Sequence, residues 1–539
     1  MKKAHQVWLP ILLVCFATVA ASAQSFRVQC PTTTITHPAA NNDHEPAYSG
    51  PTQFTQGTNG YLVPSHNVNG AIKCQQISGG DGYATMGDGT QTYMFSFGPL
   101  SGLADIIAGR PGTQSPSTFN TVYPGGTANP LQPGDPATTI NNGGLFTYNG
   151  AVGLVPDVDA NNGAGAASAK LTGHVDPRQM LDVGVMNGNI PAPLMAIDED
   201  DEFFLTLSNV GMIMRPDLFE QHTVHFHGYP NASSFYDGVP DASVAINIGG
   251  SFTYYYLAPD AGTYFWHCHI TPPEHLQMGM VGQIYVRPRQ NRVIGSLSSG
   301  LLNQQGDLRT ACRRPGDGAT PSVSTAPDIL CSNPMPAVAT SASNDGTHKY
   351  AYNDGDGSTA YDIEYPIQIH GFDPNFHFVG MTFNPEGFAD MKDKYFLLNG
   401  RSYPDTVTAG PMQTQSADGA SHFSQPLPSI INIPVGGKAL LRISDLDVTE
   451  YQTLASLGIP MKVIAINAKL LRDQAGNNLY YNTNSITLAG GESLDVILDA
   501  SDTSKYPAKS VFYLYTPNLD HLSNDAENFG GLMTEVRIN

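Results

Sequence analysis

The sequence is poor in basic residues and in long apolar segments. Its 539 residues include 26 Lys and Arg against 47 Asp and Glu, a formal net charge of −21. Such an acidic surface disfavours nucleic acid and anionic membranes as partners. It is compatible with cationic substrates, and it also serves solubility. After residue 23 no apolar run reaches the roughly 18 residues that a membrane helix needs, so we expect no membrane span.

The amino terminus has the pattern of a signal peptide. Lys2 and Lys3 precede an apolar run at 7–19, and small residues follow at 21–23. This pattern predicts that residues 1–23 are removed on export. We therefore expect a periplasmic or extracellular protein.

Cysteine is scarce, and its count is odd after this segment. Of the six cysteines, five lie beyond residue 23. In an oxidising compartment cysteines pair, and the pairings closest in sequence are Cys30–Cys74 and Cys312–Cys331. Cys268 then remains as a free thiol with a histidine on each side, which indicates a metal ligand.

Long helical patterns are nearly absent, whereas 55 Gly and 40 Pro mark frequent turns. Short apolar strands between turn residues predict an all-β protein built as sandwiches or barrels. The expected strands are 92–97, 203–207, 223–227, 251–257, 262–267, 282–286, 363–369, 395–398, 439–443, 461–466, 493–498 and 511–515.

The strand pattern and the length predict two β domains. Residues 24–180 read as a loop-rich amino-terminal extension with the first strands of domain 1, and 109–168 as a surface insertion. Regular structure is expected from about Asp182. The remaining divisions are domain 1 at 181–288, a linker at 289–358 and a cysteine-free domain 2 at 359–539.

Two segments carry the chemistry, QHTVHFHG at 221–228 and FWHCHITPPEHLQMGM at 265–280. A type 1 copper site needs two imidazoles, one thiolate and a weak axial thioether. Here Cys268 offers the thiolate, while His222 and His275 offer the imidazoles. Met280 is the expected axial ligand, and Met278 is the alternative. Zinc is the alternative metal, but a Cys-His-His-Met set favours copper.

The histidines alternate along both segments. His225 and His227 are two residues apart on an expected strand, and so are His267 and His269 around Cys268. Alternate residues of a strand share one face. We therefore predict a second metal site of four imidazoles behind Cys268, to which electrons pass from the first site.

The motifs H-x-x-H-x-H-G at 222–228 and H-C-H-(x5)-H-(x4)-M at 267–280 resemble the copper signatures of multicopper oxidases. Residues 187–209, 237–256 and 262–269 resemble the family's first cupredoxin domain, and 395–406, 436–446, 461–471 and 491–500 its copper-free middle domain. The resemblance implies two cupredoxin-like Greek-key β-sandwich domains.

The resemblance also implies roles for individual residues. The type 1 copper would be bound by His222, Cys268, His275 and Met280. The ligands that one domain gives to a trinuclear, type 2/type 3 oxygen-reducing cluster would be His225, His227, His267 and His269. Asp237 would deliver protons to reduced oxygen, although a turn-forming Asp before Gly238 explains its presence as well.

The sequence departs from the family in three respects. The cysteine-bearing motif lies in the first domain, as in some two-domain oxidases, whereas three-domain oxidases carry it in the last domain. Cys268 and His275 are seven residues apart, where many members have five, and this loop is closer to that of copper nitrite reductases. A complete cluster needs eight histidines, whereas domain 2 has no H-x-H pair among His370, His377, His422 and His521. We read HGFDPNFH at 370–377 as structural. The missing ligands are expected across a subunit interface, in a dimer or a trimer.

The function expected from this resemblance is oxidation of a small reductant, a phenol or a metal ion, with dioxygen reduced to water. One alternative is a copper nitrite reductase-like enzyme. The other is a non-enzymatic blue-copper electron carrier or copper-handling protein. A redox partner protein is a further possible electron donor, whereas no nucleic acid partner is expected.

Overall fold

The computed structural model describes residues 28–120 except 59, 156–158, 171–175, 187–307 except 213, 216, 230–232 and 259, 331–380, 387–415 and 421–539. The expected signal peptide and most of the 109–168 insertion lie outside these residues. Among the helices described, none is long and apolar enough to cross a membrane.

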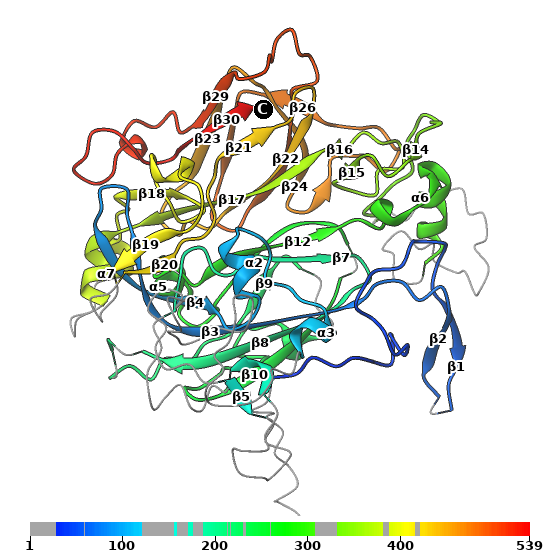
Figure 1. The fold of residues 1–539 in the computed structure, drawn as a ribbon, viewed down its shortest axis with the longest axis horizontal. Helices are drawn as coiled ribbons and strands as arrows, with labels where there is room; N and C mark the ends of the chain where they lie inside the picture. The colour runs from blue at the N-terminus through cyan, green and yellow to red at the C-terminus, as the bar shows by residue number, and fades with distance from the viewer. Residues whose placement is uncertain are drawn as a thin grey trace, which may run out of the picture.

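The first domain is a sandwich of two four-stranded sheets (Figure 1). One sheet has the order β10-β8-β3-β4 and the other the order β7-β12-β11-β9. Their bounds are β3 (Ile72–Thr85), β4 (Gln91–Pro99), β7 (Met195–Asp198), β8 (Glu202–Gly211), β9 (His225–His227), β10 (Ser251–Leu257), β11 (Gly262–His267) and β12 (Val281–Arg287). Phe97, Phe203 and Trp266 belong to the buried core between the sheets.

The expectation that regular structure begins near Asp182 is wrong. Strand β4 contains the predicted segment 92–97, and the long strand β3 runs parallel to β8 inside the first sheet. The sequence of β3 hides a strand because Gly79, Gly80 and Gly82 have low strand propensity. Most of β3 is buried, so it also lacks the alternation of apolar and polar residues that marks a half-exposed strand.

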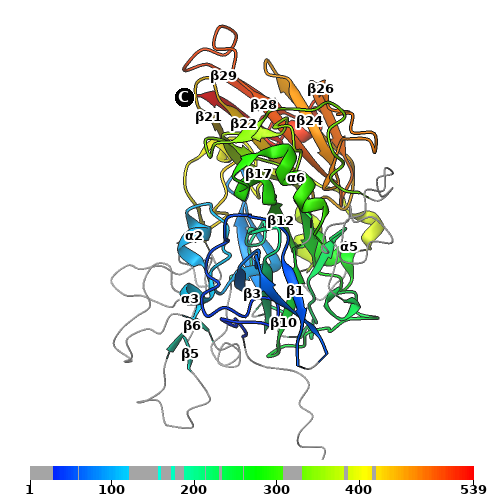
Figure 2. The same cartoon turned by 90° about the vertical axis from the view of Figure 1, so that its right-hand side faces the viewer.

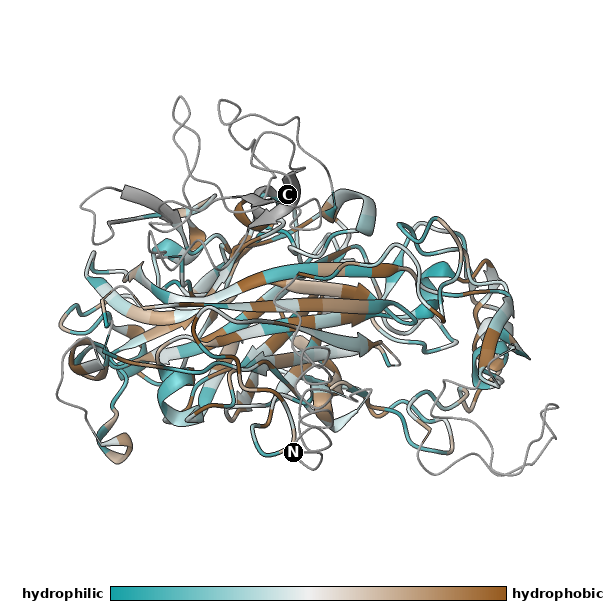
Figure 3. Ribbon diagram, turned by 90° about the horizontal axis from the view of Figure 1, so that it is seen from below, coloured by the Kyte–Doolittle hydropathy of each residue, from teal (hydrophilic) through white to brown (hydrophobic). Residues whose placement is uncertain are grey.

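The second domain is a second sandwich, with sheet orders β18-β17-β22-β28-β24-β25 (β26 pairing with β24) and β21-β30-β29-β23-β27. Its bounds are β17 (Ile363–Phe372), β18 (Tyr395–Leu398), β21 (Ile431–Ile433), β22 (Lys438–Asp445), β23 (Gln452–Leu457), β24 (Met461–Ile466), β25 (Lys469–Leu470), β26 (Tyr481–Thr483), β27 (Ser485–Leu488), β28 (Ser493–Asp499), β29 (Val511–Tyr515) and β30 (Met533–Ile538). Figure 3 views the molecule from below, with domain 1 in front, and shows apolar segments along its strands. The expected all-β fold with two sandwich domains is confirmed.

The remaining elements are short. They are β1 (Gln53–Gln56), β2 (Leu62–His66), α2 (Leu103–Ile107), α3 (Pro116–Phe119), β5 (Pro156–Val158), β6 (Leu171–Val175), η3 (Ser234–Tyr236), α5 (Pro272–Gln277), η4 (Arg289–Arg292), β13 (Gly295–Ser296), α6 (Leu297–Gln305), β14 (Ser343–Asn344), β15 (Lys349–Tyr350), β16 (Ala360–Tyr361), α7 (Pro374–Gly380), η5 (Phe388–Asp390), η6 (Asp405–Val407), β19 (Met412–Gln415), β20 (Ser421–Ser424) and η7 (Asp520–Leu522). The expected linker 289–358 thus contains a capped helix and paired strands.

The described cysteines agree with the predicted pairing. Cys30 and Cys74 form a disulfide. Cys331 is also disulfide-bonded, and its expected partner Cys312 lies outside the described residues. Cys268 is free and buried.

The two domains stack along the vertical direction of Figure 2 and meet in a buried charge network. Arg287 of β12 lies 2.7 Å from Glu364 of β17, and Arg442 of β22 lies 2.9 Å from the other oxygen of the same carboxylate. Burial raises the pKa of Glu364, but the two guanidinium groups outweigh it and hold the pKa at about 2. The network fixes domain 2 against the sheet that carries β11.

Candidate metal centre

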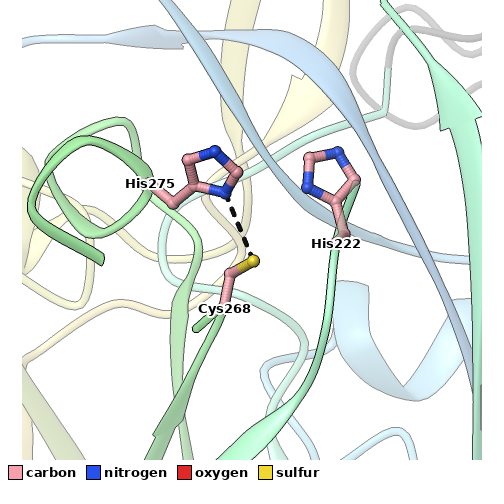
Figure 4. A group of neighbouring side chains, drawn as sticks. All are labelled: His222, Cys268 and His275. Carbon is pink, nitrogen blue, oxygen red and sulfur yellow. Dashed lines mark hydrogen bonds between the residues drawn. The ribbon is translucent and has the colours of Figure 1, made fainter. Parts of the chain in front are cut away.

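The predicted type 1 ligands His222, Cys268 and His275 lie together and are buried. Their ligating atoms are all within 4.8 Å of one another. Nδ1 of His275 lies 3.2 Å from Sγ of Cys268, with the ring of His222 on the other side of the sulfur (Figure 4). Cys268 directly follows β11, and His275 sits on α5, a short helix that Pro272 and Pro273 begin. The seven-residue gap therefore holds a helical turn.

His222 reaches this group by a route that differs from the predicted strand 223–227. It pairs with Ile246 in an isolated bridge, and β9 begins only at His225. Neither ring nitrogen of His222 makes a hydrogen bond within the described structure. A buried polar ring without partners is unusual unless a ligand satisfies it. The ring therefore fits a metal ligand.

Gly79 of β3 is a part of this group that the sequence did not reveal. A Cβ at this position would lie 2.6 Å from Cδ2 of His222, well inside van der Waals contact. The backbone of β3 thus packs directly on the ligand ring, and only glycine leaves room for it. The glycine-rich sequence of β3 was the feature that could have indicated this close contact.

The thiol and the imidazoles change each other's ionisation. Burial raises the pKa of Cys268, but His275 and His222 outweigh it and hold the pKa well below its usual range. Burial likewise lowers the pKa of His275, whereas the Cys268 thiolate and Glu220 raise it to about 9. The lowered pKa of Cys268 favours the thiolate, which is the form that binds metals.

Met280 is better placed than Met278 to be the axial ligand. The backbone N–H of Cys268 donates to the carbonyl of Met280 at 3.1 Å, which places the two residues opposite each other beyond the β11–β12 ladder. Directly opposed residues send their side chains to one face. In contrast, Sδ of Met278 lies 3.4 Å from the position of a Cβ on Gly380, against domain 2.

The four histidines behind Cys268 form the predicted face. His225 and His267 oppose each other in the β9–β11 ladder. Ring centroids of His225 lie 5.2 Å from His267, 5.1 Å from His269 and 6.0 Å from His227. The ligating atoms of His225, His227 and His267 fit within 4.8 Å of one another. Their exposure falls from His227, which is exposed, to His267, which is buried.

Two of these rings are oriented by main-chain carbonyls. Nδ1 of His225 lies 2.7 Å from the carbonyl oxygen of Asp237, and Nδ1 of His267 lies 2.7 Å from that of Cys268. A carbonyl only accepts, so Nδ1 carries the proton and Nε2 is left free for a metal. Burial, followed by the neighbouring imidazoles, lowers the pKa of His267 to about 3 and keeps it neutral.

Asp237 lies beside this face. Its Oδ2 is 3.4 Å from Nδ1 of His225, and its side chain is 27% exposed. Gly238 next to it has φ +86, and a Cβ there would meet the carbonyl of Val224 at 2.0 Å. The backbone therefore requires glycine directly after Asp237. The Asp237 carboxylate also contacts a candidate ligand.

The histidines of domain 2 supply no ligating nitrogen to either group where their side chains are described. His370 and His377 contact main-chain carbonyls, as structural histidines do. His521 lies 3.0 Å from Gln452 and stacks on Phe396. The side chain of His422 lies outside the description.

The donor sets fit copper. Two imidazoles, a thiolate and a thioether are the ligands of a type 1 centre, and clustered neutral imidazoles suit further copper ions. Residues 170–291 match the family model described as multicopper oxidase. This segment, which contains both groups, is a multicopper oxidase domain, and copper is the metal that the family uses.

Curated relatives agree with this assignment. Laccase abr2 of Aspergillus fumigatus is 33% identical over 134 residues, covering 24% of this chain and 20% of that protein. Multicopper oxidase MmcO of Mycobacterium tuberculosis is 32% identical over 133 residues (23% and 25%). A copper-containing nitrite reductase of Rhizobium meliloti is 34% identical over 118 residues (21% and 28%). The chain thus spans about a fifth to a quarter of the length of these relatives.

Among solved structures, the blue copper oxidase of Nitrosomonas europaea aligns with a TM-score of 0.45 and 16% identity, over 86% of this chain and 85% of that one.

Proposed function

We propose that this protein is an exported multicopper oxidase, which oxidises a small reductant at the His222–Cys268–His275 group and reduces dioxygen at the four-histidine face. The observation that carries the proposal is that Cys268 belongs to the first group and is joined in the chain to two histidines of the four-histidine face. Copper, when bound, supplies one-electron transfer at both. Cys268 links them because His267 and His269 are its covalent neighbours, and its carbonyl accepts from His267 at 2.7 Å.

The reductant side of the proposal rests on Glu220. Nδ1 of His275 faces the thiolate, so Nε2 points the other way, to Oε2 of Glu220 at 3.5 Å. His275 is fully buried, whereas the Glu220 side chain is 26% exposed. Proximity to His275 lowers the pKa of Glu220 and keeps it a carboxylate. A carboxylate here would accept the proton of a phenol or attract a metal cation as each gives up its electron.

The oxygen side requires a second set of ligands. Strand β9 is the edge of its sheet, and His227 on it is exposed. An edge that carries ligands is open to another subunit. We propose a homo-oligomer, either a dimer whose four-histidine faces oppose each other or a trimer with ligands from a neighbour. Asp237, beside His225, would supply protons to reduced oxygen there.

Oxygen uptake with a phenol and with Fe(II) or Mn(II) tests the proposal, alongside copper counted per mass-defined oligomer. We expect uptake, an intense blue band and more than one copper per chain. A single copper per chain together with no oxygen uptake would contradict the oxidase proposal. His348→Ala is the control because this histidine is exposed and its Nδ1 lies 3.0 Å from the surface residue Asp362.

A copper nitrite reductase-like activity is the second candidate. Two observations favour it. Two of the relatives are copper-containing nitrite reductases, and seven residues separate Cys268 from His275, as described above. Nitric oxide formed from nitrite and a reduced donor would select this activity. A blue band with neither product would leave an electron carrier or copper-handling protein, fed by a redox partner.

A further inference from the structure

Domain 2 holds the loop that connects His275 to Met280. Nε2 of His370, on β17, lies 2.9 Å from the carbonyl oxygen of Leu276. Nε2 of His377, on α7, lies 2.9 Å from the carbonyl oxygen of Gln277. Both rings are buried, and both acceptors lie at the end of α5, where helix carbonyls lack intrahelical partners.

The side chain of Gln277 adds two more contacts from domain 2. Its Nε2 donates to Asp393 at 2.9 Å, and its Oε1 accepts from the backbone N–H of Asp373 at 2.9 Å. Nδ1 of His377 lies 2.5 Å from the carbonyl oxygen of Tyr93 on β4, so the neutral ring, which has one N–H, donates to one of its two carbonyl neighbours at a time. Two consecutive loop residues are therefore fixed by four contacts from a domain that holds no predicted ligand.

We propose that His370 and His377 are positioning residues of the copper centre, which fix from domain 2 the loop carrying His275 and Met280. This inference rests on the proposed type 1 site. A loop held at Leu276 and Gln277 keeps the distance between His275 and Met280 constant when the copper changes oxidation state. Outer contacts of this kind tune metal affinity and potential.

A matched control exists in the same domain. His521 is as buried as His370, makes side-chain contacts and stacks on Phe396 at 3.8 Å, but it does not touch the loop. The variants His370→Phe, His377→Phe and His521→Phe remove ring N–H groups at similar volume. His370→Gln restores a donor, so it separates the lost hydrogen bond from damage to packing.

Hydrogen exchange of the metal-free protein tests the inference without copper. The amides of Met278, Gly279 and Met280 are bonded within the loop, to the carbonyls of Glu274, Leu276 and His275. We expect roughly tenfold faster exchange there in His370→Phe and His377→Phe, since each variant removes a ring donor from a buried carbonyl of the loop. His521→Phe and His370→Gln should exchange like the wild type. Equal acceleration in His521→Phe, or none in the first two variants, would overturn the inference.

The copper-loaded protein gives a second readout. We expect the reduction potential and the copper hyperfine coupling to shift in His370→Phe and His377→Phe and to stay unchanged in His521→Phe. Shifts that are the same in all three would overturn the positioning role. If the wild type develops no blue band, the proposed type 1 site fails, whereas the exchange experiment still decides whether domain 2 fixes the loop.

Discussion

The two histidine groups of domain 1 differ in how complete they are. The expected ligands around Cys268 are buried, and His222, His275 and Met280 all come from the same domain. The face formed by the other four histidines lies on an edge strand, and its members range from buried to exposed. Folding of one chain brings the expected ligands of the first group together, whereas the function proposed above requires further ligands for the second group from another subunit. Under that proposal, electron acceptance belongs to the single chain and oxygen reduction to the assembly.

The largest expected effect breaks the link between the two groups. Cys268→Ser should abolish the blue band and lower oxygen uptake by far more than the roughly 100-fold that loss of an outer contact costs. Visible spectroscopy and an oxygen electrode measure both. Retained uptake without the blue band would show that the two groups work independently.

His227→Ala should impair the four-histidine face and leave the group around Cys268 intact. We expect the blue band to persist and oxygen uptake to fall by roughly 100-fold, because a ligand of the exposed face is lost while the buried group is untouched. Electron paramagnetic resonance of both copper types records the split. Loss of the blue band as well would show that the two groups are not separable in folding.

Gly79→Ala should weaken the buried group alone. The added Cβ would lie 2.6 Å from the ring of His222, so we expect type 1 copper affinity to fall roughly 10- to 100-fold. Copper titration under reducing conditions measures this affinity. Gly306→Ala is the control, since among the described residues its Cβ would meet Asn303 O at 3.2 Å and Pro51 at 3.9 Å. An unchanged affinity in Gly79→Ala would contradict the contact.

The smallest effect on either copper group is expected from Glu364. Its pKa of about 2 in the fold lies below the ordinary 4.5, so its contribution is present above pH 4.5 and is lost as pH falls toward 2. Glu364→Gln should remove a few kcal/mol of stability at pH 7 and flatten acid unfolding in that window. Unfolding midpoints across pH measure this. A steep acid transition that persists in the variant would contradict the assignment.

The sequence predicted the ligand groups better than it predicted their support. Alternating histidines are visible in the sequence because the side chains of a strand return to the same face every two residues. This pattern placed His225 and His267 on one face. Strands such as 461–466 and 511–515 were predicted with their observed bounds. Strand β3 was missed because its glycines and its nearly continuous burial conceal the strand pattern. The contact of His370 with Leu276 was missed because it joins segments far apart in the chain.

Strand β3 also decides where this copper domain begins. It lies between β8 and β4, so residues 72–99 supply half of one sheet and the backbone on which His222 rests. The segment 170–291 that matches the family model is therefore not a module that can be cut out. An excised fragment starting near residue 182 would expose the side of β8 that β3 covers, and a shortened version of this protein has to begin upstream of Ile72.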